Sequence, residues 1–152
     1  MSKNIQRIVF CFLILTSPIL KAQECSVIYV SPGGATSGVA GTKSNPASLQ
    51  YGLTLVNGAN SRIYLRAGTY NINNEINLIS NCRIEGGFNS NWQKSNGSET
   101  IIYRDFTNPS TNPIRLIAVS GVNITNFEIH DLTIKTANAI GNGVSTYGMY
   151  LS

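Results

Sequence analysis

The stretch Val122–Ile134, VNITNFEIHDLTI, decides the fold of this chain. A spacing of two places both side chains of an apolar pair on one face of a strand. The β-branched and aromatic content of the stretch favours strands over a helix. The pattern therefore predicts three two-residue strands joined by two tight corners, which make one coil of a β-solenoid. The pairs are Val122/Ile124, Phe127/Ile129 and Leu132/Ile134, and the corners are Thr125-Asn126 and His130-Asp131.

Similar apolar pairs recur upstream, which predicts a solenoid over residues 61–152. One apolar residue of each coil, here called its anchor, is expected at an equivalent position in the next coil. The anchors are 21, 18, 22 and 25 positions apart, a loose period typical of solenoids whose loops vary in length. A β-sandwich is the alternative, and it predicts longer strands joined by hairpins. Short strands without Asn-Gly hairpin signals favour the solenoid. The anchors are Ile63, Ile84, Ile102, Ile124 and Met149.

Residues 23–60 are expected to form a lid for the solenoid. A strand is predicted at Ser26–Ser31, followed by a Gly/Ser/Thr-rich loop from Pro32 to Ser44. Asn45-Pro46 then offers a cap and a first helical residue. Leu49, Leu53 and Val56 lie on one face of the short helix that follows, and Asn57-Gly58 is expected to end it.

Residues 1–22 are typical of a secretory signal, with Lys3 and Arg7 before the apolar run Ile8–Leu15. A membrane anchor is disfavoured because the run is too short for a hydrocarbon core of about 30 Å. Removal of the signal leaves eight basic and seven acidic residues, a net charge of about +1. We therefore expect a secreted, extracellular or bacterial cell-surface protein with no membrane span after signal removal. No basic run indicates nucleic-acid binding.

Two cysteines, Cys25 and Cys82, remain after the signal. An oxidising compartment would permit a disulfide between them, but the distance that decides it is not encoded in sequence. Two cysteines are too few for a metal site. The mature part contains 17 Asn residues, which suits many tight corners, while the regular apolar positions disfavour disorder.

The seven acidic residues of the mature part form no DxD or DD cluster, so no catalytic set, metal or cofactor is predicted. Glu128 and Asp131 are expected on the outer face or corner of the clearest coil, facing a groove or simply solvent. Trp92, Tyr103 and Phe106 fall in or beside polar excursions. Their rings would stack on sugars in a binding site, or would shield the outer wall.

RIYLRAGTY, residues 62–70, resembles the opening coil of bacterial right-handed parallel β-helix proteins of the pectate-lyase-like superfamily. IEGGFNSNWQ, residues 84–93, is similar to a recurring module of secreted and surface β-helix proteins. The likeness covers nearly all of residues 26–152 and implies an all-β, right-handed parallel β-helix with an N-terminal capping helix. It also implies a helix of many more coils, so the chain is expected to be truncated at its C-terminal end.

Two functions from different classes stay open. The first is a non-enzymatic, secreted or cell-surface scaffold for adhesion or carbohydrate binding, whose partner is an extracellular polysaccharide or a cell-surface ligand. The second, implied by the resemblance, is the N-terminal part of a polysaccharide lyase or glycoside hydrolase whose catalytic coils lie beyond residue 152. The small number of candidate catalytic acids and bases favours the non-enzymatic scaffold.

Overall fold

The computed structural model describes residues 27–58, 61–106, 115–138, 140 and 143–152. The predicted signal, residues 1–22, and Cys25 lie outside these ranges. So do residues 59–60, 107–114, 139 and 141–142.

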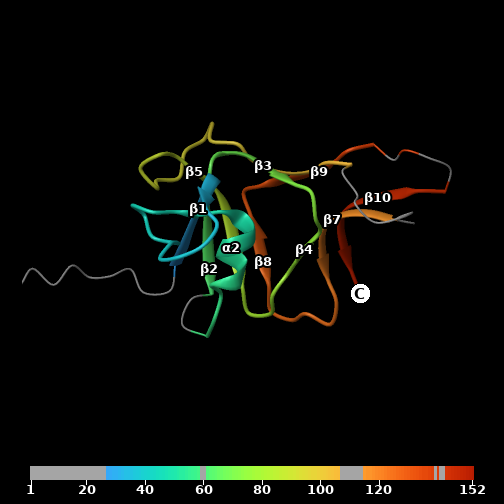
Figure 1. Cartoon of the computed structure of the whole chain (residues 1–152), viewed down its shortest axis with the longest axis horizontal. Helices are drawn as coiled ribbons and strands as arrows, with labels where there is room; N and C mark the ends of the chain where they lie inside the picture. The colour runs from blue at the N-terminus through green and yellow to red at the C-terminus, as the bar shows by residue number, and fades with distance from the viewer. Residues whose placement is uncertain (1–26, 59–60, 107–114, 139, 141–142) are drawn as a thin grey trace, which may run out of the picture.

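The described chain is predominantly β-structure, with one six-residue helix, and its strands form three parallel sheets (Figure 1). Sheet A has the strand order β1-β2-β5-β8, sheet B the order β3-β6-β9, and sheet C the order β10-β7-β4. The elements are β1 Val27–Ala35, α2 Leu49–Thr54, β2 Arg62–Arg66, β3 Gly68–Ile72, β4 Ile76–Asn77, β5 Arg83–Phe88, β6 Thr100–Arg104, β7 Arg115–Gly121, β8 Glu128–His130, β9 Thr133–Thr136 and β10 Ser145–Leu151.

From β2 onward the chain visits the three sheets in a fixed order. It passes through sheet A, sheet B and sheet C in turn, and it completes three such rounds between β2 and β10. Every pairing between named strands is parallel, so each strand lies beside its equivalent from the previous round. Long-range pairing, rather than hairpins, therefore holds the fold together.

Rows of apolar side chains run across each sheet and face the core. In sheet A, Ile28, Ile63, Ile84 and Ile129 are successive register partners. The first three are at most 4 % exposed, whereas Ile129, in the last round, is half-buried. Sheets B and C show the same loss of burial in their last rounds. Their rows are Tyr70–Ile102–Ile134 and Ile76–Val119–Met149.

The register corrects the sequence-based repeat. Ile63 and Ile84 are partners in sheet A as predicted, but Ile102 lies in sheet B and Met149 in sheet C. The sheet A partners are 35, 21 and 45 positions apart, so the period in the twenties is wrong. Excursions of different length, such as residues 89–99, separate the strands by unequal stretches of chain. Such insertions are compatible with unchanged pairing in the sheets.

Two of the three strands predicted in Val122–Ile134 are confirmed as β8 and β9, and the third is wrong. Val122 is 62 % exposed and lies with Asn123 in a bend, because the preceding strand β7 already ends at Gly121. Both predicted corners are confirmed. Asn126 and Asp131 have φ angles of 54° and 51°, in the left-handed region that Asn and Asp tolerate better than other side chains.

Residues 27–58 contain the predicted strand and the predicted short helix, with differences at their ends. Helix α2 lies against β1, and Leu49 is buried in the core cluster (Figure 1). Asn45 is not the N-cap. Ser48 takes that role, and its hydroxyl accepts a bond from the Tyr51 backbone N–H at 3.3 Å. The helix ends at Thr54, before the predicted stop at Asn57-Gly58. The preceding strand, β1, is longer than predicted and continues through Pro32 to Ala35.

Strand β5 continues through Gly86-Gly87 to Phe88. Between the register pairs Tyr64↔Glu85 and Arg66↔Phe88, β5 carries one residue more than β2, which is a β-bulge. Gly87 has a φ of 79°, and a Cβ on Gly86 would lie 2.4 Å from the backbone oxygen of Asp131. The glycines therefore allow the next corner to approach this strand closely.

Candidate functional site

The outer face of sheet A carries two cross-strand rows in which all side chains except that of Val27 are polar or aromatic. Parallel register places Tyr29, Tyr64, Glu85 and His130 in one row. The second row, one pleat away, runs Val27–Arg62–Arg83–Glu128. The side chains of a strand alternate between its two faces. The apolar residues next to these positions in the sequence therefore fill the core, while the two rows face outward.

An ion-pair cluster occupies the β5–β8 part of this face. Glu85 forms ion pairs with Lys94 Nζ at 3.0 Å and with Arg83 Nε at 3.2 Å. Arg83 Nη1 lies 3.4 Å from the Glu128 carboxylate, which also contacts His130 Nε2 at 3.1 Å. Lys94 Nζ additionally donates to the Asp131 carboxylate and, at 2.6 Å, to the Gly86 carbonyl. The cluster consists of Arg83, Glu85, Lys94, Glu128, His130 and Asp131.

Lys94 lies at the centre of the cluster, where its own pKa and that of Asp131 are both shifted. Partial burial would lower the pKa of its ammonium, but the hydrogen bonds and charges of Asp131 and Glu85 outweigh burial and raise that pKa. The hydrogen bond and charge of Lys94 lower the pKa of the Asp131 carboxyl. Both groups are therefore held in their charged forms at neutral pH, and Asp131 is a poor proton donor.

An aromatic cluster continues the same face toward β1. Tyr29 meets Trp92 edge to face at a centroid distance of 4.7 Å, and Tyr64 stacks on Phe88 at 4.3 Å. The Arg66 guanidinium lies over the Trp92 ring at 4.5 Å, and Trp92 Nε1 donates to the Lys43 carbonyl at 3.2 Å. Trp92 is therefore engaged by its own protein, so the 89–99 excursion folds back onto sheet A.

Tyr103 has a different environment on the outer face of sheet B. Its register partners are Asn71 on β3 and Lys135 on β9, and both are exposed. Tyr103 is half-buried and, within the described chain, its ring has no aromatic or cationic partner and its hydroxyl no hydrogen bond. An aromatic ring thus lies between an amide and an ammonium group, all on neighbouring strands of one rigid sheet.

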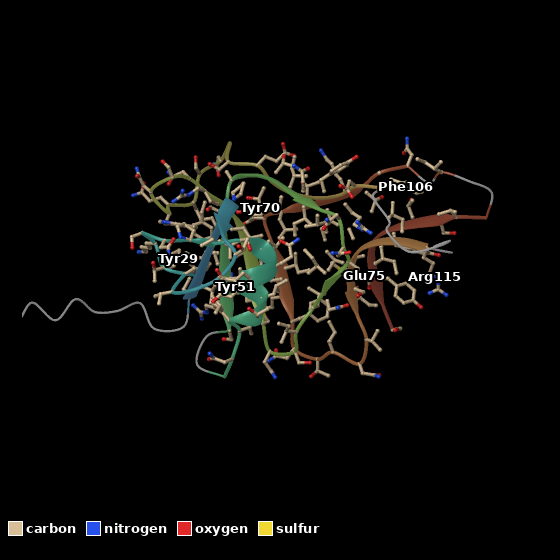
Figure 2. All side chains as sticks on the ribbon, in the orientation of Figure 1. Tyr29, Tyr51, Tyr70, Glu75, Phe106 and Arg115 are labelled. Carbon is tan, nitrogen blue, oxygen red and sulfur yellow. The ribbon has the colours of Figure 1, made fainter. Side chains whose placement is uncertain are left out.

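The structure brings only some of the predicted binding residues together. Glu128 and Asp131 share the ion-pair cluster, and Trp92 lies two residues from Lys94 but packs toward Tyr29. Tyr103 is on sheet B, and Phe106 follows β6 at the opposite end of the molecule from Tyr29 (Figure 2). The five residues therefore do not form a single site.

Sequence reasoning missed Lys94, Asn71 and Lys135. Lys94 sits in a polar excursion and reaches Asp131 across 37 positions, so no local pattern marks it. Asn71 and Lys135 look like ordinary exposed strand positions. Only the register of β3, β6 and β9 places them on either side of Tyr103.

Cys82 is buried, and burial raises the pKa of its thiol. Since Cys25 lies outside the described residues, the disulfide between them stays a prediction. In the described ranges, no three His, Cys, Asp or Glu side chains group closely enough to hold a metal ion. Within those same ranges, no helix is long and apolar enough to cross a bilayer.

Comparison of the chain with protein-family models, with curated proteins and with solved structures found no match.

Proposed function

We propose that this chain forms a right-handed parallel β-helix that is exported and binds a polysaccharide outside the cell. The cyclic order of three parallel sheets supports the β-helix, because successive rounds of one chain produce that order. The short helix α2 against β1 supports the role of an N-terminal cap.

The observation that carries the binding role is the row Asn71–Tyr103–Lys135 on sheet B. Aromatic rings bury the apolar face of a sugar, and neighbouring amides and ammonium groups donate to its hydroxyl oxygens. The three residues lie on adjacent strands about 4.8 Å apart, a spacing set by the backbone and independent of ligand. A rigid, repetitive surface of this kind suits a repetitive polymer.

The acids of sheet A favour binding over catalysis in this part of the chain. Glu85, Glu128 and Asp131 are each within 3.4 Å of a cationic side chain, so their negative charges are neutralised within the fold. A glycosidase needs one carboxyl group that holds a proton near neutral pH. The pKa of the Asp131 carboxyl is lowered instead, so this group does not hold a proton near neutral pH.

The test is co-sedimentation of the full chain with insoluble neutral and acidic polysaccharides, with the Tyr103→Ala variant as the comparison. We expect the variant to bind about tenfold more weakly, because loss of a stacking ring costs about 1–1.5 kcal/mol. Tyr103→Phe keeps the ring and is expected to bind within threefold of the parent. Equal binding by Tyr103→Ala and the parent would refute the site.

Turnover is measured in the same incubations. New reducing ends or unsaturated ends would overturn the non-enzymatic role and support the lyase or hydrolase alternative. Binding without new ends supports the scaffold.

A further inference from the structure

A pocket of about 170 Å³ opens at the N-terminal edge of sheet A, where strands β2, β5 and β8 begin. It lies away from the Tyr103 row, which is on sheet B. Its lining is polar and comes from three successive rounds of the chain. The lining residues used below are Arg62, Asn81, Cys82, Arg83, Asn126 and Glu128.

Two arginines stand side by side in this pocket. Arg62 and Arg83 are register partners on neighbouring parallel strands, so their stems leave the same face of the sheet about 4.8 Å apart. Arg83 is paired with Glu85 and Glu128. Arg62 is exposed, and no carboxylate of the described chain lies within ion-pair distance of it.

The charges of the pocket lining do not cancel. Within the lining, two guanidinium groups face one carboxylate, that of Glu128. Arg83 is also paired with Glu85, which lies outside the lining, so the positive charge without an ion-pair partner among the described residues is that of Arg62. Cys82 adds no negative charge, because burial raises the pKa of its thiol. Like charges on adjacent strands repel unless an anion lies between them.

Stacked corners hold the rim of the pocket in place. Asn81 and Asn126 both adopt the left-handed conformation, with φ angles of 59° and 54°. Asn126 Nδ2 donates to Asn81 Oδ1 at 2.9 Å, and the Asn81 backbone N–H donates to the Thr125 carbonyl at 3.0 Å. The Asn81 amide nitrogen has no partner among the described residues, so it is available to a ligand.

We propose that this pocket binds one tetrahedral oxyanion, a sulfate or phosphate group, between the guanidinium groups of Arg62 and Arg83. The three or four oxygens of such a group point in tetrahedral directions, so it can accept from both arginines and from the Asn81 amide at once. A carboxylate presents only two oxygens, in one plane. The pocket volume of about 170 Å³ is large enough for a single charged group but not for an oligosaccharide, since pockets for larger ligands usually measure 300–1,000 Å³. The shared chemistry fits free inorganic oxyanions and sulfated or phosphorylated polymers.

The experiment is calorimetric titration of the full chain with sodium sulfate, sodium phosphate and sodium acetate, at ionic strength fixed with sodium chloride. We expect sulfate or phosphate to bind at least tenfold more tightly than acetate. Arg62→Gln is expected to reduce that affinity at least tenfold, and Arg62→Lys to reduce it less, because an ammonium cannot donate bidentately. Arg62 has no partner in the described fold, so its replacement should leave the unfolding midpoint unchanged.

Arg115→Gln is the matched control, since it removes an exposed arginine at the far end of the molecule from Tyr29 (Figure 2). It is expected to leave the affinity for sulfate unchanged. Equal binding by Arg62→Gln and the parent, equal losses in both variants, or no preference over acetate would each overturn the proposal. A sulfated polymer compared with its desulfated form then separates a polymer ligand from a free ion. Binding of the free ion but not the polymer retains the pocket and assigns it an inorganic ligand.

This inference does not depend on the Tyr103 site. Arg62→Gln is expected to retain binding to neutral polysaccharides, and Tyr103→Ala is expected to retain sulfate binding. The two proposals can therefore fail separately.

Discussion

Replacement of isoleucines along one row of sheet A should cost different amounts of stability at different positions. Ile63 is fully buried between its register partners Ile28 and Ile84. Ile63→Ala removes three carbon atoms, worth about 2.4 kcal/mol at about 0.8 kcal/mol each. The cavity left behind adds to this, so we expect a loss of about 3–5 kcal/mol in the free energy of unfolding.

Ile129 belongs to the same row but lies in the last round, where it is half-buried and has a partner on one side in the described chain. Because part of its surface is already exposed, Ile129→Ala should cost about 1–2 kcal/mol. The two alanine variants remove the same atoms from the same type of strand. The difference between their losses in the free energy of unfolding therefore measures the effect of lying in an inner or in the last round of the chain.

The assay is guanidinium unfolding followed by the fluorescence of Trp92, with the slope of the transition compared between variants. Ile63→Val serves as the conservative control and should cost about 0.5–1.5 kcal/mol. Losses for Ile63→Ala and Ile129→Ala that agree within 0.5 kcal/mol (about the additivity error of such data) would refute the reasoning. They would mean that another surface covers the last round in solution.

Three further predictions concern single substitutions. The buried Tyr70 hydroxyl lies 2.8 Å from the Arg66 carbonyl and 3.0 Å from the Val30 carbonyl. Tyr70→Phe removes both contacts and should lower the free energy of unfolding by about 1–2 kcal/mol in urea, and no change would show that these contacts add no stability. Gly86→Ala would place a Cβ 2.4 Å from the Asp131 carbonyl oxygen and should cost about 1–3 kcal/mol in the same assay, whereas Gly97→Ala, with open space around it, should be neutral. The pKa of Asp131 is lowered in the folded state, so its contribution to stability is present above its ordinary pKa of 3.8 and is lost as pH falls through the folded value. Asp131→Asn should therefore reduce the fall in melting temperature below pH 4, and an unchanged acid profile would contradict that linkage.

The strands and corners were predictable from local sequence because their signals are local. Pairs of apolar residues at a spacing of two marked β2, β8 and β9, and polar pairs marked the corners at Asn126 and Asp131. The error at Val122/Ile124 has a physical cause. The same spacing also occurs where a chain leaves a strand, and periodicity alone cannot tell a short strand from a bend.

The binding surfaces were less predictable than the fold. Trp92 was a reasonable choice by residue type, but Tyr29 and Arg66 occupy its ring in the folded protein. Tyr103 is equally aromatic and keeps its ring unpartnered in the described chain. The difference arises because Trp92 sits in an excursion that folds back onto sheet A, whereas Tyr103 sits in a strand between the exposed register partners Asn71 and Lys135.

The sequence by itself determined that the described chain is built of short strands with Asn- and Gly-rich corners and carries a short helix after its first strand. Backbone sterics and the two-residue period act over a few positions, so local residues suffice. The tertiary structure decided which strands are neighbours, since excursions of unequal length hide the register. That register puts Arg62 beside Arg83, Tyr103 between Asn71 and Lys135, and Lys94 against Asp131. Each of these placements is a long-range consequence of parallel pairing, which no local pattern encodes.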